Sequence, residues 1–261
     1  MSVTMRISIE YERPADGPGS GPVTVGWLRD IQKGGVLYDP PERLVSRDVS
    51  RTHAKSAARC PAVIQMESRY FQVSCPFDLR LGFTRDAEGK PALVNRAGTG
   101  SAIRGSKIAG LVSLVNEVEW RYPDRPTIQL NLPYIFLADE PVHITQLAPF
   151  LHYRPDPLPG TIFGGRFPIS LWPRPLMWAF EWHDPSRDIV LRRGEPLFYV
   201  QFEADNPARP IQLVEADMTP EVRAYIDHIS GAVNYVSQTF SLFKAAEAAR
   251  PARLVVPKRG G

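Results

Sequence analysis

Proline and glycine interrupt this chain so often that the sequence favours many short strands and turns over long helices. The chain has 261 residues, of which 26 are proline and 19 are glycine. Both residues break helices and hydrogen-bonded strand ladders. Between the breaks lie apolar or alternating stretches of about five to ten residues, a usual length for strands. The sequence therefore predicts a mainly β single domain of the sandwich, jelly-roll or β-clip type.

The expected strands follow from apolar alternation or from short apolar runs. In residues 3–11, apolar side chains alternate strictly with polar ones, which is the period of a half-buried strand. Residues 39–59 and 84–107 are expected to be loops, the first with one short helix. The strands expected before residue 183 are 3–11, 23–28, 62–66, 70–75, 111–120, 127–132, 134–137, 142–153, 162–172 and 176–182.

The stretch from Trp178 to Glu203 carries a dense group of aromatic side chains and indicates two β-segments around a turn. Side chains alternate across a strand, so each segment has two distinct faces. The apolar faces are expected to interdigitate as core, and their residues are Trp178, Phe180, Trp182, Phe198, Val200 and Phe202. The opposite faces are expected to converge on a more polar surface made of Glu181, His183, Tyr199 and Gln201.

This polar surface suggests a catalytic or metal site. Glu181 and His183 are candidates for an acid/base pair, and His143 and His152 from the neighbouring segment are candidates to join His183 as metal ligands. Two histidines and a carboxylate suit non-haem iron. The alternative is that the histidines make local hydrogen bonds and that Glu181 pairs with an arginine such as Arg174 or Arg192.

A second hypothesis is an exposed aromatic binding surface for a sugar, a base or a peptide proline. Aromatic side chains supply a large contact area at low entropic cost. The alternative is that these rings belong to an ordinary core. The candidate ligand-binding residues are Trp172, Trp178, Trp182, Tyr199 and Gln201.

The last part of the chain changes to a helical period. Thr219 and Pro220 make a good helix start, with an N-cap followed by proline at the first helical position. An apolar stripe over 222–243 then recurs every three or four residues, in an amphipathic helix expected over 219–248. This helix either docks on the β-rich domain of residues 1–218 or pairs with a second subunit as a homo-oligomer. Residues 249–261 are expected to form a flexible basic tail.

The two cysteines fall opposite each other if residues 62–66 and 70–75 pair around a turn at Glu67 and Ser68. Cross-strand neighbours are about 4.5–5.5 Å apart, close enough for a disulfide. Two reduced, packed thiols are the favoured alternative, because the chain shows no export signal. The redox state of Cys60 and Cys75 is left open at this point.

Charge and hydropathy narrow the possible partners. The formal net charge is +3, with basic residues spread along the chain and balanced by 28 acidic ones, so nucleic acid is not favoured. No run of about 18 apolar residues predicts a membrane span. The first residues alternate and do not form an apolar block, which argues against a signal peptide. We expect a cytoplasmic protein.

Three segments resemble an uncharacterised family of bacterial and phage proteins known as a domain of unknown function. They are RCPAVIQMESRYFQVSCPFDL (59–79), IQLNLPYIFLADE (128–140) and WPRPLMWAFEW with VLRRGEPLFYV, and together they span about residues 59–203. The family tends to carry a histidine where this chain has Asn131. The resemblance implies a β-rich fold and no particular activity.

The segment IVLRRGEPLFYVQF is also similar to the closing hairpin of the trimeric dUTP nucleotidohydrolase and dCTP deaminase fold. Those enzymes need a carboxylate in the substrate hairpin to orient a water molecule. The corresponding stretch here, GTIFGGRFPIS (160–170), contains no acid. The similarity therefore favours a shared β topology and not the hydrolytic reaction.

The sequence-based prediction is a non-catalytic binding or assembly module with a β-rich core and an aromatic hairpin. The alternative is a metal-dependent, oxygenase-like enzyme that uses iron or another divalent metal at the His/Glu site.

Overall fold

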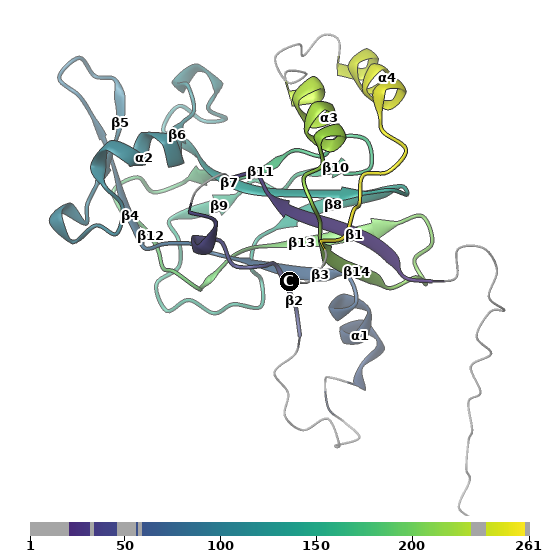
Figure 1. Ribbon diagram of the computed structural model, residues 1–261. Coiled ribbons are helices and arrows are strands. Elements are labelled where there is room, and N and C mark those ends of the chain that lie inside the picture. The colour runs from purple at the N-terminus through teal and green to yellow at the C-terminus, as the bar shows by residue number, and fades with distance from the viewer. Residues whose placement is uncertain (1–20, 32–33, 46–55, 57–58, 231–238, 259–261) are drawn as a thin grey trace, which may run out of the picture.

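The computed structural model describes residues 21–31, 34–45, 56, 59–230 and 239–258 (Figure 1). The expected strand at residues 3–11 and the part of the apolar stripe at 231–238 lie outside the described residues. The described chain is mainly β, with three sheets and two C-terminal helices, which confirms the predicted fold class.

The largest sheet has six strands in the spatial order β14, β1, β7, β11 and β9, with β6 also paired to β7. β1 and β14 run parallel, and the other pairs run antiparallel. The strands are β1 (Val23–Arg29), β6 (Val112–Leu114), β7 (Thr127–Ala138), β9 (Gly160–Ile162), β11 (Pro175–Trp182) and β14 (Ile211–Glu215).

A five-stranded sheet, entirely antiparallel, has the order β10, β8, β13, β3 and β2. Its strands are β2 (Glu42–Arg43), β3 (Tyr70–Ser74), β8 (Val142–Leu147), β10 (Arg166–Pro168) and β13 (Pro196–Ala204). A smaller sheet has the order β12, β4 and β5. These strands are β4 (Leu79–Arg85), β5 (Pro91–Asn95) and β12 (Ile189–Leu191).

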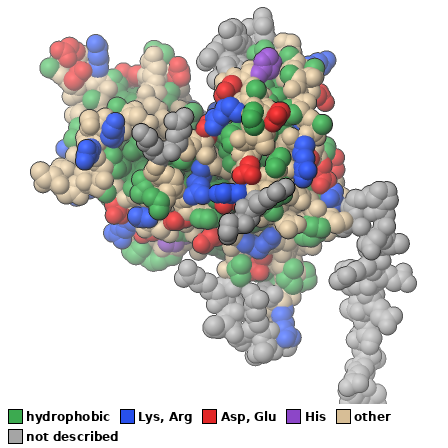
Figure 2. All heavy atoms as spheres, viewed as in Figure 1, with side chains coloured by type: hydrophobic (Ala, Val, Ile, Leu, Met, Phe, Trp, Pro, Cys, Tyr) green, Lys and Arg blue, Asp and Glu red, His purple; other side chains and the backbone are tan. Residues whose placement is uncertain are grey.

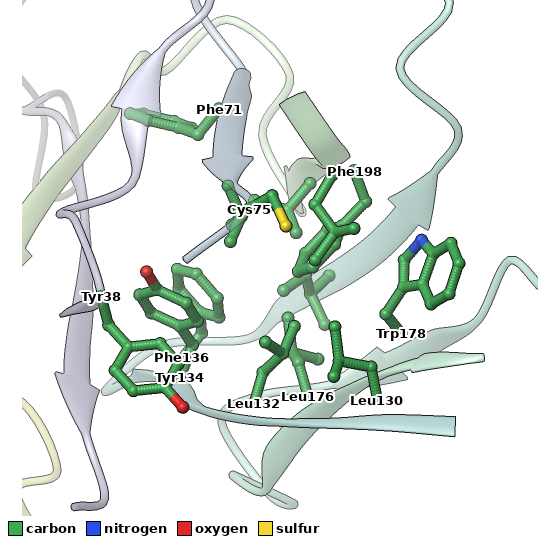
Figure 3. Close-up of a cluster of buried hydrophobic side chains, with 14 of the residues drawn as sticks. Tyr38, Phe71, Cys75, Leu130, Leu132, Tyr134, Phe136, Leu176, Trp178 and Phe198 are labelled. Atoms are coloured by element: carbon green, nitrogen blue, oxygen red, sulfur yellow. The ribbon is translucent and has the colours of Figure 1, made fainter. Parts of the chain in front are cut away.

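The inner faces of the two larger sheets share one hydrophobic core. Figure 3 shows Leu130, Leu132 and Trp178 from the six-stranded sheet facing Phe71 and Phe198 from the five-stranded sheet. The rings of Phe136 on β7 and Phe202 on β13 also meet, with their centroids 5.4 Å apart. Because side chains from both sheets interdigitate, the two sheets form a β sandwich.

Two helices cover the outer face of the six-stranded sheet, α3 (Pro220–Ser230) and α4 (Thr239–Ala249) (Figure 1). The hydroxyl of Thr219 accepts a hydrogen bond from the backbone N–H of Val222, as expected of an N-cap. The buried side chains of α3 pack on the outward-facing side chains of β1 and β7, so this part of the stripe docks on the β core. The second cluster consists of Leu28, Ile135, Leu137, Ala216, Val222, Tyr225, Ile226, Ile229, Ala246, Leu254 and Val255.

The segment after α4 is docked through residue 258, which differs from the flexible basic tail that the sequence predicted for 249–261. The guanidinium of Arg250 donates to three carbonyl oxygens, of Ser170, Ala138 and Asp139. The carboxylate of Asp139 accepts the backbone N–H groups of Leu254 and Val255, both of which are buried. The buried side chains of Leu254 and Val255 and the hydrogen bonds of Arg250 and Asp139 hold the segment in place. The composition of the segment indicated only its positive charge.

The expected strand at 62–66 is a helix, α1 (Pro61–Glu67). Pro61 occupies its first turn, where the missing N–H costs nothing. Cys60 precedes the helix and is exposed, whereas Cys75 follows β3 and is buried, and both are free thiols. The cross-strand disulfide alternative is therefore wrong, because its two strands do not exist as a pair.

Three other stretches differ locally from expectation. The expected loop at 84–107 contains β5 and the start of α2 (Gly105–Leu111). The expected strand at 111–120 shortens to β6, because a 3-10 helix follows at Glu117–Glu119. Two more 3-10 turns are Gly35–Leu37 and Gly98–Gly100.

The stretch from Trp178 to Glu203 is not a hairpin. β11 belongs to the six-stranded sheet, β12 to the three-stranded sheet and β13 to the five-stranded sheet. The turn at Gly194, with a φ of 80°, redirects the chain between two sheets and does not pair the strands around it. The chain therefore crosses the sandwich here, a route that strand periodicity does not encode.

Candidate functional site

The aromatic face predicted on β11 and β13 is core. Trp178 and Trp182 are fully buried, and Tyr199 is 2% exposed. Trp172 is half-buried, with its ring 6.4 Å from that of Phe167. The predicted stacking platform is therefore wrong for Trp178, Trp182 and Tyr199, because a ligand cannot reach the faces of buried rings.

The structure brings Glu181 and His183 into contact on the outer face of β11. Oε1 of Glu181 lies 2.9 Å from Nε2 of His183 and 3.6 Å from Nη1 of Arg125. The same nitrogen of His183 lies 3.3 Å from the hydroxyl of Thr161 on β9. Arg125, whose guanidinium lies over the ring of Tyr122, takes the place of the arginine partners expected from the sequence, Arg174 and Arg192.

This cluster explains how a carboxylate is accommodated in a β sheet. Glu181 is 4% exposed, and its Oε2 has no hydrogen-bond partner among the described residues. A buried carboxylate requires a compensating charge or a hydrogen-bond donor close by. Oε1 of Glu181 has both Arg125 and His183 as neighbours. The contacts tie β9 and the segment before β7 to β11. The pair is thus close enough for proton exchange and is also a structural link.

The histidines predicted as metal ligands lie apart. His143 is on β8 of the five-stranded sheet, in register with Glu203, and His152 lies in the loop that follows. His183 directly follows β11, a strand of the other large sheet. Among the residues that the structure describes, no group of three His, Cys, Asp or Glu side chains is placed to hold a metal ion. The predicted site for iron or another divalent metal is therefore not assembled.

Tyr199 and Gln201 also do not converge with Glu181 and His183. They point outward from the five-stranded sheet, because their neighbours Phe198, Val200 and Phe202 fill the core. Glu181 points outward from the six-stranded sheet, on the opposite side of the sandwich. The convergence prediction is wrong because it treated the two strands as neighbours in one hairpin.

The outward side of the five-stranded sheet forms a polar surface, which we call the open face. The backbone register places its side chains in rows that cross β3, β13, β8 and β10. The helices α3 and α4 pack on the six-stranded sheet and not on this surface, and α1 contacts the five-stranded sheet at β3. The open face consists of Tyr70, Gln72, Ser74, His143, Thr145, Leu147, Arg166, Gln201 and Glu203, and Tyr199 points to the same side but is buried.

An aromatic loop, residues 148–154, lies against the open face. The ring of Phe150 stands edge-on to two tyrosines, with centroids 5.2 Å from Tyr199 and 5.9 Å from Tyr70. Phe150 itself remains 54% exposed, and the exposed fraction of Tyr153 is 84%. At the end of the loop, Arg154 donates to the carbonyl of Val190 on β12. The loop is therefore fixed at both ends and exposes apolar surface between them.

The polar groups of the open face are mostly neutral. Burial raises the pKa of Tyr199, and burial together with the charge of Glu203 raises the pKa of Tyr70, so both phenols are neutral near pH 7. Glu203 pairs with Arg166 at 2.9 Å. On the side of the molecule that Figure 2 shows, basic and acidic side chains are interspersed, without a broad area of one sign.

Sequence reasoning missed the aromatic loop because it extended one strand over residues 142–153. The available signal was Pro149, which has no N–H for a ladder and ends the strand. β8 in fact stops at Leu147. The aromatic residues after Pro149 then lie in a loop, where exposed aromatic side chains are a stronger indication of binding than they are in a strand.

Comparison of the chain with protein-family models, with curated proteins and with solved structures gives no match. The resemblance of residues 59–203 to an uncharacterised bacterial and phage family therefore stays a prediction. Among the described residues, no helix has the length and apolar character needed to cross a membrane.

Proposed function

We propose that this chain is a non-catalytic binding module that engages a protein partner through the open face and the aromatic loop. One observation carries the proposal: Phe150, Leu151 and Tyr153 are all more than half exposed, in a loop anchored beside the sheet face that lies away from α3 and α4. Exposed apolar side chains grouped in this way mark interaction sites more often than scattered ones do.

The composition of the surface supports a protein partner. Tyrosine, phenylalanine and arginine are enriched in protein interfaces, and lysine is depleted. The open face and the loop carry Tyr70, Phe150, Tyr153 and Arg166, and contain no lysine. Phe150 is held against Tyr70 and Tyr199 before any partner arrives. A preorganised aromatic anchor loses little conformational entropy on binding.

Self-association through the helix stripe at 222–243 is a weaker alternative. Val222, Ile226 and Ile229 are already buried against the chain's own sheet, so this part of the stripe has no free apolar face. A cytoplasmic setting is part of the proposal, since both cysteines are free, as is usual in a reducing compartment.

Site-specific photocrosslinking in cells tests the proposal. A benzoylphenylalanine in place of Tyr153 is compared with one in place of Val118, which has the same exposure, 86% against 84%, but lies beside the β4–β5 hairpin. We expect a discrete adduct of defined mass from position 153 and none from position 118. Adding Phe150→Asp to the position-153 variant is expected to abolish the adduct.

Equal labelling from the two positions, or an adduct that survives Phe150→Asp, would contradict the proposal. An adduct of twice the chain mass would show that the partner is a second copy. Circular dichroism of each variant checks that the sandwich is intact.

A further inference from the structure

The edge of the six-stranded sheet at β9 presents unpaired backbone groups. The N–H of Phe163 donates to the carbonyl of Ala179 on β11. Because alternate residues of an antiparallel strand face the same neighbour, Thr161 also pairs with β11, and the N–H and C=O groups of Gly160 and Ile162 point away from it. Among the described residues, none forms a hydrogen bond to these groups.

Proline blocks three of the other sheet edges at positions whose backbone faces outward. They are Pro168 on β10, Pro91 on β5 and Pro41 directly before β2. Each of these edges therefore lacks a backbone donor that a further strand could use. Pro159, directly before β9, faces the other way, since its carbonyl accepts the N–H of His183.

Described groups occupy part of the two remaining edges. On β12, the carbonyl of Val190 accepts from Arg154. On β14, the carbonyl of Glu215 accepts from the N–H of Lys258. Among the described residues, β9 is thus the end of a sheet whose outward groups meet neither an outward-facing proline nor a partner.

An antiparallel pairing of β9 with a second copy of itself uses all of these groups. With a two-fold axis at Thr161, Gly160 of one copy lies opposite Ile162 of the other, and each such pair exchanges both of its hydrogen bonds. A two-fold interface uses the same patch on both subunits. The edge is therefore self-complementary.

The side chains beside the axis suit a close approach of two strands. Thr161 is exposed on the outer face and comes opposite its own counterpart, a favourable cross-strand pair. Gly160 has no side chain to hinder the second strand, and Ile162, which packs against the main core but is only half-buried, comes to lie over it. Phe163, with an exposed fraction of 36%, meets Pro159 of the other copy.

The charges at the two ends of β9 are complementary. Asp156 and Arg166 each lie five residues from Thr161, on opposite sides of it. Their side chains are 77% and 53% exposed, although each has an ion-pair partner within its own chain. Antiparallel pairing brings the end that carries Asp156 beside the end of the other copy that carries Arg166, so opposite charges meet at both ends.

We propose that two copies of the chain pair through β9, antiparallel about Thr161, and join their six-stranded sheets into one. The pairing satisfies an edge that is otherwise free to associate with other chains. β9 has three residues, so the contact is small and the dimer dissociates on dilution. The dimer does not depend on the proposed binding surface, which is on the other large sheet.

Disulfide crosslinking between copies tests the pairing and its register. Thr161→Cys places two thiols opposite each other, with Cα atoms about 4.5 Å apart, within the range of a disulfide. The matched control Phe163→Cys lies two residues along the same face, where the corresponding Cα atoms are about 14 Å apart. Both variants also carry Cys60→Ser, because Cys60 is an exposed native thiol. Under mild oxidation, Thr161→Cys should form a covalent dimer about tenfold or more faster than Phe163→Cys.

Two outcomes of this experiment would overturn the proposed pairing. If Thr161→Cys crosslinks no faster than Phe163→Cys, the strands do not pair in this register. If adding Phe150→Asp to Thr161→Cys abolishes the crosslink, the copies meet through the aromatic loop and not through β9.

Sedimentation velocity gives an independent measurement without a disulfide. Thr161→Lys should be a monomer at concentrations where the wild type dimerises, since two like charges then face each other across the axis. An equimolar mixture of Thr161→Lys and Thr161→Glu should restore the dimer. A wild type that stays monomeric at the highest concentration measured, or a Thr161→Lys variant that dimerises as well as the wild type, would contradict the pairing.

Discussion

The two large sheets share one core but treat their outer faces in opposite ways. The six-stranded sheet buries Leu28, Ile135 and Leu137 beneath α3 and α4. The five-stranded sheet directs Gln72, Gln201 and other polar or phenolic side chains outward, on the side of the sandwich away from α3 and α4. The covered face adds buried apolar area that stabilises the fold, whereas the open face adds little, and it is there that we place the proposed binding surface.

Truncating one side chain on each outer face should reveal the largest difference in stability between the two sheets. Leu137→Ala removes a fully buried side chain between β7 and the helices, and the free energy of unfolding should fall by about 2–5 kcal/mol. Gln201→Ala on the open face should change it by about 0.5 kcal/mol or less. Urea denaturation measures both. Similar losses would show that the open face is covered as well.

The inner side of the five-stranded sheet should behave as a sealed core despite its open outer face. Cys75 follows β3 and is 2% exposed, and burial raises the pKa of its thiol to about 11, from an ordinary value near 9. In the unfolded chain the thiol ionises first. This contribution to stability is therefore present below about pH 9 and is lost as the pH rises to about 11, in total about 2–3 kcal/mol.

Comparing the denaturation of the wild type with that of Cys75→Ala between pH 8 and 11 isolates the contribution of the thiol. The tyrosines titrate in both proteins, so their effect cancels in the difference. The stability difference between the two proteins should narrow or reverse in sign as the pH rises. A constant difference would mean that the thiol is as accessible when folded as when unfolded. Thiol labelling at pH 8 should modify Cys60 rapidly and Cys75 slowly, since only Cys60 is exposed.

The cover over the six-stranded sheet should depend on the docked C-terminal segment. Asp139→Ala leaves the backbone N–H groups of Leu254 and Val255 without their acceptor, and it should lower the free energy of unfolding by about 1–3 kcal/mol. Limited proteolysis should then cut after Arg250 or Arg253 faster than in the wild type. Asp184→Ala, which removes a similar cap from an exposed turn, is the matched control. Equal cleavage of the two variants would show that Asp139 does not hold the segment.

Local sequence patterns correctly predicted the structural features that depend on residues close together in the sequence. The alternation on β11 correctly separated Trp178 and Phe180 from Glu181, and the cap at Thr219 correctly located the start of α3. Both features depend on residues within a few positions of one another.

The errors concern pairing between distant segments. Nothing near Gly194 in the sequence indicates that β12 and β13 join different sheets, because strand partners are chosen by long-range packing. The proposed histidine site failed for the same reason. His143 and His183 are correctly placed on or beside strands, but the sheets that hold them face opposite ways. The contact of Glu181 with His183 was predictable, since residues two apart on a strand share a face.

Tyr153, a central residue of the proposed binding surface, should have the smallest effect on stability. Tyr153→Ala removes a side chain that is 84% exposed, so the free energy of unfolding should change by about 0.5 kcal/mol or less. A partner that covers this residue would lose a large aromatic contact, a type that is enriched among interface hot spots, at about 2 kcal/mol or more. Once the crosslinked partner is known, titration calorimetry with wild type, Tyr153→Ala and Val118→Ala measures this loss. An unchanged affinity for Tyr153→Ala would remove the loop from the interface, and an equal loss in Val118→Ala would show that exposure alone, and not the open face, explains the binding.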